Sequence, residues 1–226
     1  MSRVIVFDLM GTLLDLQSLD TYFERFFDNA AVRKEWFMQT LQLAMAAMLT
    51  NAYEDFGVQT DTSLEITARR YKVSMLGEEK NLILGTLRKL RPFPDVSKSL
   101  QSMRAAGLRL AVLTNSTAQV VEAQLAHAGL QGHFEQVISS DEIQCFKPAP
   151  EVYHLAAKRL GVKPGQIRLV SAHDWDVTGA LRAGCAASFV ARPGQVMNPF
   201  GPQPDVKGTD MVEVAEKILT ADLEQG

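Results

Sequence analysis

Cysteine is scarce in this chain of 226 residues, which has only Cys145 and Cys185. The two are far apart and show no CxxC or Cys/His spacing, so the sequence indicates neither a disulfide framework nor a zinc site. Two buried free thiols in a reducing compartment are expected instead. The apolar run that starts after Arg3 has no basic segment followed by a long hydrophobic stretch, so a secretory signal is not expected and the predicted location is cytoplasmic.

Long apolar runs and an excess of positive charge are also missing. The nearest approach to a membrane span, residues 41–49, contains Gln42 and falls short of the roughly 20 residues that cross a bilayer. The formal net charge is −3, which disfavours a nucleic-acid partner because phosphate backbones bind basic surfaces. The cluster of Arg88, Lys89 and Arg91 is better interpreted as a solvated helix end. We therefore expect no membrane and no nucleic-acid partner.

Apolar residues are plentiful, at 46% of the chain, which is enough for a sizeable core. The apolar run 4–7 ends at Asp8 and is followed by Gly11, which predicts a buried parallel strand that delivers Asp8 to its carboxyl end. Over residues 16–90 the apolar residues recur at helical spacing instead. This pattern predicts an all-helical insert after the first strand.

After Pro92 and Pro94 the pattern alternates between strand and helix. The predicted strands are 108–113, 134–139, 167–171 and 187–191, and the predicted helices are 95–106, 117–127, 150–160, 176–183 and 210–219. With the first strand, this order implies right-handed crossovers and an α/β fold with a doubly wound parallel, Rossmann-like sheet. The predicted domains are a core of 1–15 and 91–226 and a helical domain of 16–90. Residues 193–204 are expected to form a surface loop.

Polar clusters follow the apolar strands at the points where a parallel sheet brings strand ends together. They supply an aspartate, a hydroxyl with an amide, a lysine and a further acidic pair, which suit a nucleophile, a substrate clamp, a cation and a water-orienting group. Each cluster alone is weak evidence, since such residues usually cap helices or form turns. Their joint occurrence favours an active site. The clusters are Asp8-Gly11-Thr12, Thr114-Asn115-Ser116, Lys147-Pro148 and residues 171–176.

The first of these clusters lies in the segment Phe7-Asp8-Leu9-Met10-Gly11-Thr12-Leu13, which resembles the first motif of the haloacid dehalogenase superfamily. Residues 113–115, Lys147-Pro148 and residues 170–179 resemble its second, third and fourth motifs, in the same order. The similarity covers essentially the whole chain, and the helical insert resembles the superfamily's cap domain. The resemblance implies a hydrolase that works through a covalent aspartyl intermediate on Asp8.

Two positions depart from the phosphatases of this superfamily. Met10 stands where phosphatases carry an aspartate that transfers a proton, and a thioether cannot do so. Ala172 stands where they carry a magnesium-binding aspartate, and a methyl group cannot bind a hard cation. A magnesium-dependent phosphatase that uses His173, Asp174 and Asp176 instead remains one alternative. A non-catalytic homologue is a second, although retention of the polar clusters weighs against it.

The branch that lacks both aspartates is the type II 2-haloacid dehalogenases, whose segments resemble Phe134-Glu135, Val152-Tyr153, Trp175-Asp176 and residues 178–180. The resemblance implies hydrolysis of a small organic acid, a 2-haloacid, without a metal or cofactor. Asp8 would attack the halogen-bearing carbon, Lys147 would orient Asp8, and Asp176 would aid the hydrolytic water. The site residues expected to contact or surround the substrate are Thr12, Thr114, Asn115, Tyr153 and Ser171.

Two further positions depart from that branch. The dehalogenases usually carry an arginine directly after a tryptophan in the cap, and this arginine binds the leaving halide. The corresponding residues here are Trp36-Phe37. The usual asparagine of the fourth motif is His173, which could orient water or act as a base, or could simply be a hydrogen-bonded strand-end histidine.

Met10 and Phe37 are expected to line an apolar pocket between core and cap, whereas Trp36 is expected to pack within its own helices. The remaining histidines, His127, His133 and His154, are interpreted as structural or solvated. The apolar helical insert could also support a homodimer.

Overall fold

The apolar run after Arg3 forms the central strand of a parallel sheet in the computed structural model, which describes residues 3–223. Strand β1 (Val4–Phe7) is buried along its whole length and pairs in parallel with β4 (Leu110–Thr114) and β6 (Ile167–Ser171). The strands β5 (Gln136–Ser139), β7 (Ala186–Val190) and β8 (Val206–Gly208) complete the order β5-β4-β1-β6-β7-β8. The predicted doubly wound parallel sheet is confirmed.

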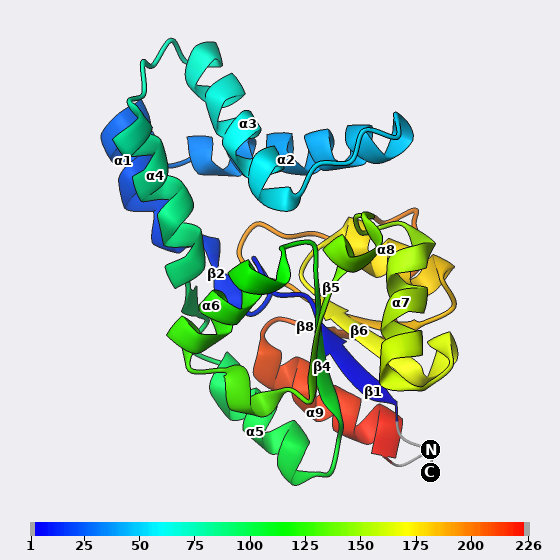
Figure 1. Cartoon of the computed structure of the whole chain (residues 1–226). Helices are drawn as coiled ribbons and strands as arrows, with labels where there is room; N and C mark the ends of the chain where they lie inside the picture. Colours follow the sequence, from blue (N-terminus) through cyan, green and yellow to red (C-terminus); the bar gives the residue numbers. More distant parts are fainter. Residues whose placement is uncertain (1–2, 224–226) are drawn as a thin grey trace.

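Helices cover both faces of this sheet (Figure 1). Alternate residues of β1 face opposite sides: Val4 and Val6 pack with α7 (Pro150–Leu160) and α8 (Asp174–Arg182), whereas Ile5 and Phe7 belong to the core on the other side. That second core includes α5 (Val96–Ala105), α6 (Ala118–Ala128) and α9 (Met211–Leu223). Because both faces are covered, the central strand β1 is a continuous apolar run, and β4 is apolar up to its last residue, Thr114.

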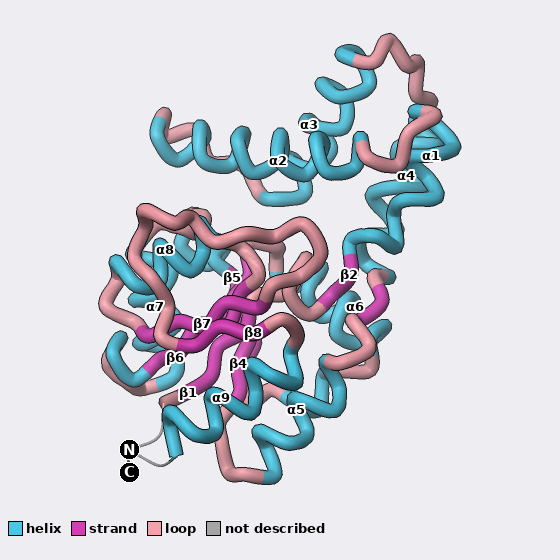
Figure 2. Tube along the Cα trace, turned by 180° about the vertical axis from the view of Figure 1, so that it is seen from behind, coloured by secondary structure: helices cyan, strands magenta, loops and turns pink. Residues whose placement is uncertain are grey.

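Four helices between β2 (Leu14–Asp15) and β3 (Arg91–Pro92) stand apart from the sheet in both views (Figures 1 and 2). They are α1 (Asp20–Phe27), α2 (Val32–Leu49), α3 (Phe56–Arg70) and α4 (Gly77–Thr86). The antiparallel pair β2–β3 joins the start and end of this segment. Helix α2 reaches over the carboxyl ends of the strands, so that Phe37 lies against His173, with ring centroids 6.0 Å apart.

The aromatic residue Trp36 packs inside the helical segment, as expected. It is fully buried, its indole N–H donates to the Thr60 carbonyl at 3.0 Å, and its ring centroid lies 5.4 Å from that of Phe23. Cys145 and Cys185 are both buried and free, as expected. Among the described residues, no helix is both long enough and apolar enough to cross a membrane.

The structure also contains elements that the sequence patterns did not predict. Strands β2, β3 and β8 are two or three residues long, too short for a periodic signal. Strands β4 and β5 each begin two residues later than predicted, and α8 begins at Asp174 rather than Asp176. Two acidic residues in the first turn of α8 favour this earlier start through the helix dipole. Residues 193–204 form the expected surface loop, in which Phe200 is 97% exposed.

Two helical glycines offer a matched test of the packing beside α7. A Cβ on Gly179 would lie 2.5 Å from the Tyr153 hydroxyl and 2.6 Å from Pro148 Cβ, whereas a Cβ on Gly85 would meet nothing within 4 Å. Gly179→Ala should therefore cost about 1–3 kcal/mol of unfolding free energy by overpacking. Gly85→Ala should instead add up to about 1 kcal/mol through helix propensity. Urea unfolding measures both, and equal effects would contradict the close packing at Gly179.

Candidate active site

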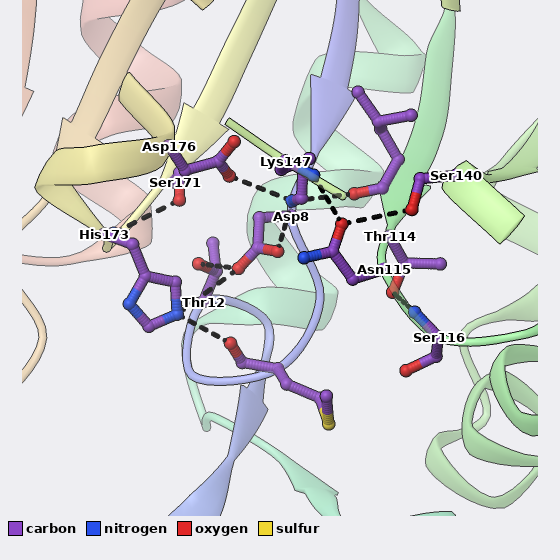
Figure 3. A network of polar contacts seen from close by, with 12 residues as sticks. Asp8, Thr12, Thr114, Asn115, Ser116, Ser140, Lys147, Ser171, His173 and Asp176 are labelled. Atoms are coloured by element: carbon purple, nitrogen blue, oxygen red, sulfur yellow. Dashed lines mark hydrogen bonds and ion pairs between the residues drawn. The ribbon is translucent and has the colours of Figure 1, made fainter. Parts of the chain in front are cut away.

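Side chains from separate segments meet at the carboxyl ends of β1, β4 and β6 (Figure 3). Asp8 follows β1, Thr114 ends β4, and Ser171 ends β6. Lys147 comes from the loop before α7, and Asp176 from the first turn of α8. The crevice forms here because β1 lies between β4 and β6, whose connections leave toward opposite faces of the sheet.

The Lys147 ammonium lies between two carboxylates. Its Nζ is 2.7 Å from Asp8 Oδ1 and 2.9 Å from Asp176 Oδ2, and it also donates to the Leu113 carbonyl at 3.1 Å. An ammonium has three N–H donors, so this set uses all of them. The side chains of Lys147 and Asp176 are almost fully buried, with exposures of 1% and 0%. Burial lowers the pKa of Lys147, but Asp176 and Asp8 outweigh it and raise the pKa above its ordinary value.

The second oxygen of Asp8 has its own partners. Thr12 Oγ1 donates to Asp8 Oδ2 at 2.6 Å, and the same hydroxyl accepts the Ala172 N–H at 2.9 Å. His173 Nε2 lies 3.6 Å from Asp8 Oδ2. Burial raises the pKa of Asp8, but Lys147, His173 and Thr12 together lower it below the ordinary value, so Asp8 is ionised at neutral pH.

The hydrogen-bond donors around Asn115 allow only one of the two orientations of its side-chain amide. Its Oδ1 accepts from the Lys147 backbone N–H at 2.9 Å and from Ser140 Oγ at 3.1 Å. A backbone N–H can only donate, so the Asn115 amide nitrogen must be the atom left to donate elsewhere. Thr114 Oγ1 accepts from the Ser116 N–H at 3.2 Å and likewise keeps its own proton to donate. Both side chains thus present donors to an anionic ligand.

His173 is fixed by hydrogen bonds and by aromatic neighbours. Its backbone N–H donates to Ser171 Oγ at 3.1 Å, and its Nε2 lies 2.9 Å from the Met10 carbonyl oxygen. The ring stands between Trp175, at 5.3 Å, and Phe37, at 6.0 Å between centroids. It therefore joins the end of β6 to helix α2.

These groups surround a small cavity of about 20 Å³. Its walls are formed by Asp8, Met10, Phe37, Leu41, Phe56, Thr114, Asn115, Lys147, His173 and Trp175. Seven of the predicted site residues are among them, including both residues expected to give an apolar wall, Met10 and Phe37. The cavity combines an ionised carboxylate and several donors with an otherwise apolar surface.

Four predicted site residues lie behind the cavity wall rather than on it. Tyr153 is 1% exposed, and its hydroxyl donates to Asp176 Oδ1 at 2.7 Å. The Thr12 and Ser171 hydroxyls contact Asp8 and the His173 backbone, and Asp176 contacts Lys147. The positions of Thr12, Tyr153 and Ser171 therefore do not support the prediction that they contact substrate, because their hydroxyls already have protein partners.

Three lining residues were absent from the predicted site, namely Leu41, Phe56 and Trp175. Leu41 follows Phe37 by one helical turn on the same face of α2, so helical spacing could have identified it. Trp175 adjoins His173 in sequence. Phe56 begins α3, after the Asp55 cap, and shows no distinguishing signal in the sequence.

The donor set does not fit a resident metal ion. Within residues 3–223, no group of three or more His, Cys, Asp and Glu side chains could hold one. Asp8 and Asp176 are already bridged by the Lys147 ammonium, and the methyl of Ala172 offers no ligand. The positive charge that a carboxylate pair needs is thus supplied by a side chain.

Removing this ammonium should affect stability in a pH-dependent way. Lys147→Met leaves two buried carboxylates without a cation and should cost about 3–5 kcal/mol of unfolding free energy near pH 7.5. The pKa of Asp8 should then rise, so the deficit should shrink as the pH falls to about 5 and Asp8 binds a proton. In the wild type the lowered pKa keeps this contribution constant over that range.

Urea unfolding at both pH values measures this difference. Lys158→Met is a matched control, because Lys158 is exposed on α7 and has no ion pair among the described residues. A deficit that is equal at the two pH values would contradict the proposed coupling between Lys147 and Asp8.

Comparisons with known proteins agree with this architecture. A family model described as haloacid dehalogenase-like hydrolase matches residues 2–184. The (S)-2-haloacid dehalogenase of Pseudomonas sp. (strain YL) is 32% identical over 96% of this chain and 94% of its own length. Haloacetate dehalogenase H-2 of Moraxella sp. (strain B) is 29% identical, covering 90% of this chain and 92% of its own.

A solved structure shows the same fold. The L-2-haloacid dehalogenase of Xanthobacter autotrophicus with chloropropionic acid covalently bound aligns with a TM-score of 0.89 and 26% identity, over 98% of this chain and 99% of that one. The matched segment contains β1, β4 and β6 with the residues at their ends. The chain therefore belongs to the haloacid dehalogenase-like hydrolase family.

Proposed function

We propose that this hydrolase removes halide from a small 2-haloacid through an ester on Asp8. The observation that carries the proposal is the position of Asp8, which is ionised, held by Lys147 and Thr12, and exposed to a small cavity with apolar walls. A buried carboxylate that is kept ionised is a competent nucleophile toward carbon. The names of the relatives described above support the same substrate class.

The first step exchanges one bond at carbon for another. An Asp8 oxygen forms a bond to C2 of the acid, and the C2–halogen bond breaks, with its electron pair leaving as halide. Backside attack would invert the configuration at C2. The Asn115 amide and the Thr114 hydroxyl are the donors positioned to bind the substrate carboxylate, which fixes C2 against Asp8.

The second step returns Asp8 to its starting form. Water adds to the ester carbonyl carbon of Asp8 and loses a proton to a base. The bond between that carbon and the ester oxygen then breaks, and the leaving oxygen takes the proton from the base as the 2-hydroxy acid departs. The second proton of the water is released to solvent when Asp8 returns to its carboxylate form. Of the two groups predicted to assist this water, His173 lines the cavity and Asp176 does not. We therefore assign the base to His173 and a positioning role to Asp176, which holds Lys147.

To act as the base, the His173 imidazole must be neutral and must carry its proton on the right nitrogen. Nε2 faces both Asp8 and the Met10 carbonyl, and a nitrogen that bonds to a carbonyl must carry a proton. Nε2 can accept the water's proton only in the form that carries its hydrogen on Nδ1. No hydrogen bond of Nδ1 is found among the described residues, so neither form is locked from that side.

We also propose that residues 16–90 act as the cap and the rest of the chain as the core. Phe37, Leu41 and Phe56 from the helical segment close the cavity over Asp8. The cavity around Asp8 is small, at about 20 Å³, in keeping with a small organic acid as substrate. The buried thiols of Cys145 and Cys185 are consistent with the predicted cytoplasmic location, and a homodimer through the helical segment stays a prediction.

A magnesium-dependent phosphatase is the alternative within the family. It would need ligands that surround a cation beside Asp8, where Lys147 already lies. A phosphoryl dianion would also enter a cavity whose wall includes Met10 and Phe37. The donor set therefore favours carbon–halogen chemistry.

Matched substrate panels test the proposal. The wild type should release halide from 2-chloro- and 2-bromopropionate and from haloacetates, with and without EDTA, and should release no phosphate from phosphate esters. Asp8→Asn should lower halide release by on the order of 10⁴-fold. Magnesium-dependent phosphate release would overturn the proposal, and inactivity of the folded wild type on both panels would point to a non-catalytic homologue.

The role of His173 is tested by separating the two steps. His173→Gln keeps a donor for the Met10 carbonyl but removes the base, so steady-state turnover should fall about 10²–10⁴-fold. A burst of one halide per enzyme should survive, because the first step does not use His173. Rapid-quench halide assays measure the burst, with His127→Ala, an exposed residue on α6, as control. A lost burst, or unchanged turnover, would contradict the assignment.

A further inference from the structure

A second cavity adjoins the catalytic one. It has a volume of about 220 Å³ and lies between helix α2 and the loop that follows β7. Phe37 and His173 line both cavities, so these two rings form the partition between them. The mechanism described above makes no use of this space.

Cationic side chains predominate on the wall of the second cavity, which contains Arg33, Lys34 and Arg192 and one carboxylate, Asp15. Arg33 forms an ion pair with Asp20, and Arg192 with Asp95 at 2.7 Å. The Asp15 carboxylate accepts the Gln17 N–H at 2.8 Å, which caps a short helical turn. Asp15, Asp20 and Asp95 thus each accept from at least one protein donor, whereas Lys34 and Arg192 each have a donor group without a protein partner among the described residues.

Arg192 is the first of these two. It is only 7% exposed, its Nε donates to the Thr12 carbonyl at 3.0 Å, and its guanidinium lies 3.9 Å from the Phe93 ring centroid. Its Nη2 is buried and has no hydrogen-bond partner within residues 3–223, as is also true of Asp95 Oδ1. Asp95 does not line the cavity, but Arg192 does. A buried, unpaired guanidinium donor is costly, so it calls for an acceptor.

Lys34 is the second. It is an exposed residue that lines the cavity, and its ammonium forms no ion pair or hydrogen bond in the described part of the chain. A Cβ built on Gly194 would lie 3.6 Å from Lys34 Nζ, so the ammonium stands over the loop that forms the opposite wall. An ammonium and a guanidinium that face one cavity from two elements make a site for an anion.

We propose that this cavity binds a small monovalent anion, a halide or a carboxylate, on its way to or from Asp8. The identity of the anion, as the halide product or the carboxylate of the substrate, rests on the proposed function. The cations line a cavity that shares its Phe37 and His173 walls with the cavity around Asp8.

Crystals of the wild-type protein grown with sodium bromide test the site without turnover. The bromide anomalous signal should appear within hydrogen-bond distance of the Arg192 guanidinium and of Lys34 Nζ. A parallel crystal with acetate and no halide separates the two sources, since carboxylate density at the same atoms identifies a carboxylate site. Absence of both anions from this cavity would overturn the proposal, whether or not the protein dehalogenates.

Solution measurements separate a functional site from an adventitious ion only. Lys34→Met should weaken bromide binding, followed by quenching of tryptophan fluorescence, by about fivefold. It should raise the inhibition constant of bromide, or the KM of the haloacid, by a similar factor while leaving kcat unchanged. Lys34→Arg should restore both values, and Lys158→Met is the control. A bromide peak in the crystal without these changes in solution would also overturn the proposal.

Discussion

The buried ion pair between Lys147 and two carboxylates is the constraint on which the rest of the site depends. Isolated, each of these charges would be expensive to bury, and together they hold one another in place. Lys147 reaches this position because the chain brings the loop before α7 under the end of β1, between β4 and β6. The fold thereby holds the pKa of this strand-end aspartate below its ordinary value.

The remaining polar residues divide by whether they face the cavity. Asp8, Asn115, Thr114 and His173 present atoms to it, whereas the buried hydroxyl of Tyr153 holds Asp176 from behind. This division follows from hydrogen-bonding capacity, because a hydroxyl that already bonds to the protein has little left for substrate. It also explains why Asp176, with Lys147 and Tyr153 as partners, is better suited to positioning than to proton transfer.

Much of this arrangement could be predicted from the sequence. Continuous apolar runs predicted the parallel sheet, and the polar clusters at the strand ends identified Asp8, Asn115 and Lys147 as site residues. The strand β8 was not predicted because three residues are too few to show a hydrophobic period. Other features depend on long-range packing, which local sequence patterns do not encode. They are the position of Tyr153 behind Asp176, the place of Phe56 in the cavity wall and the unpaired Nη2 of Arg192.

The origin of the product's hydroxyl oxygen tests the central claim, attack by Asp8 on carbon, most directly. The measurement is one turnover of a 2-haloacid in H₂¹⁸O with enzyme in excess, followed by mass spectrometry of the hydroxy acid and of the peptide that contains Asp8. An ester on Asp8 predicts an unlabelled hydroxyl in the product and ¹⁸O in the Asp8 carboxylate. Labelled product with unlabelled Asp8 would mean that water attacks the substrate directly, and would contradict the account.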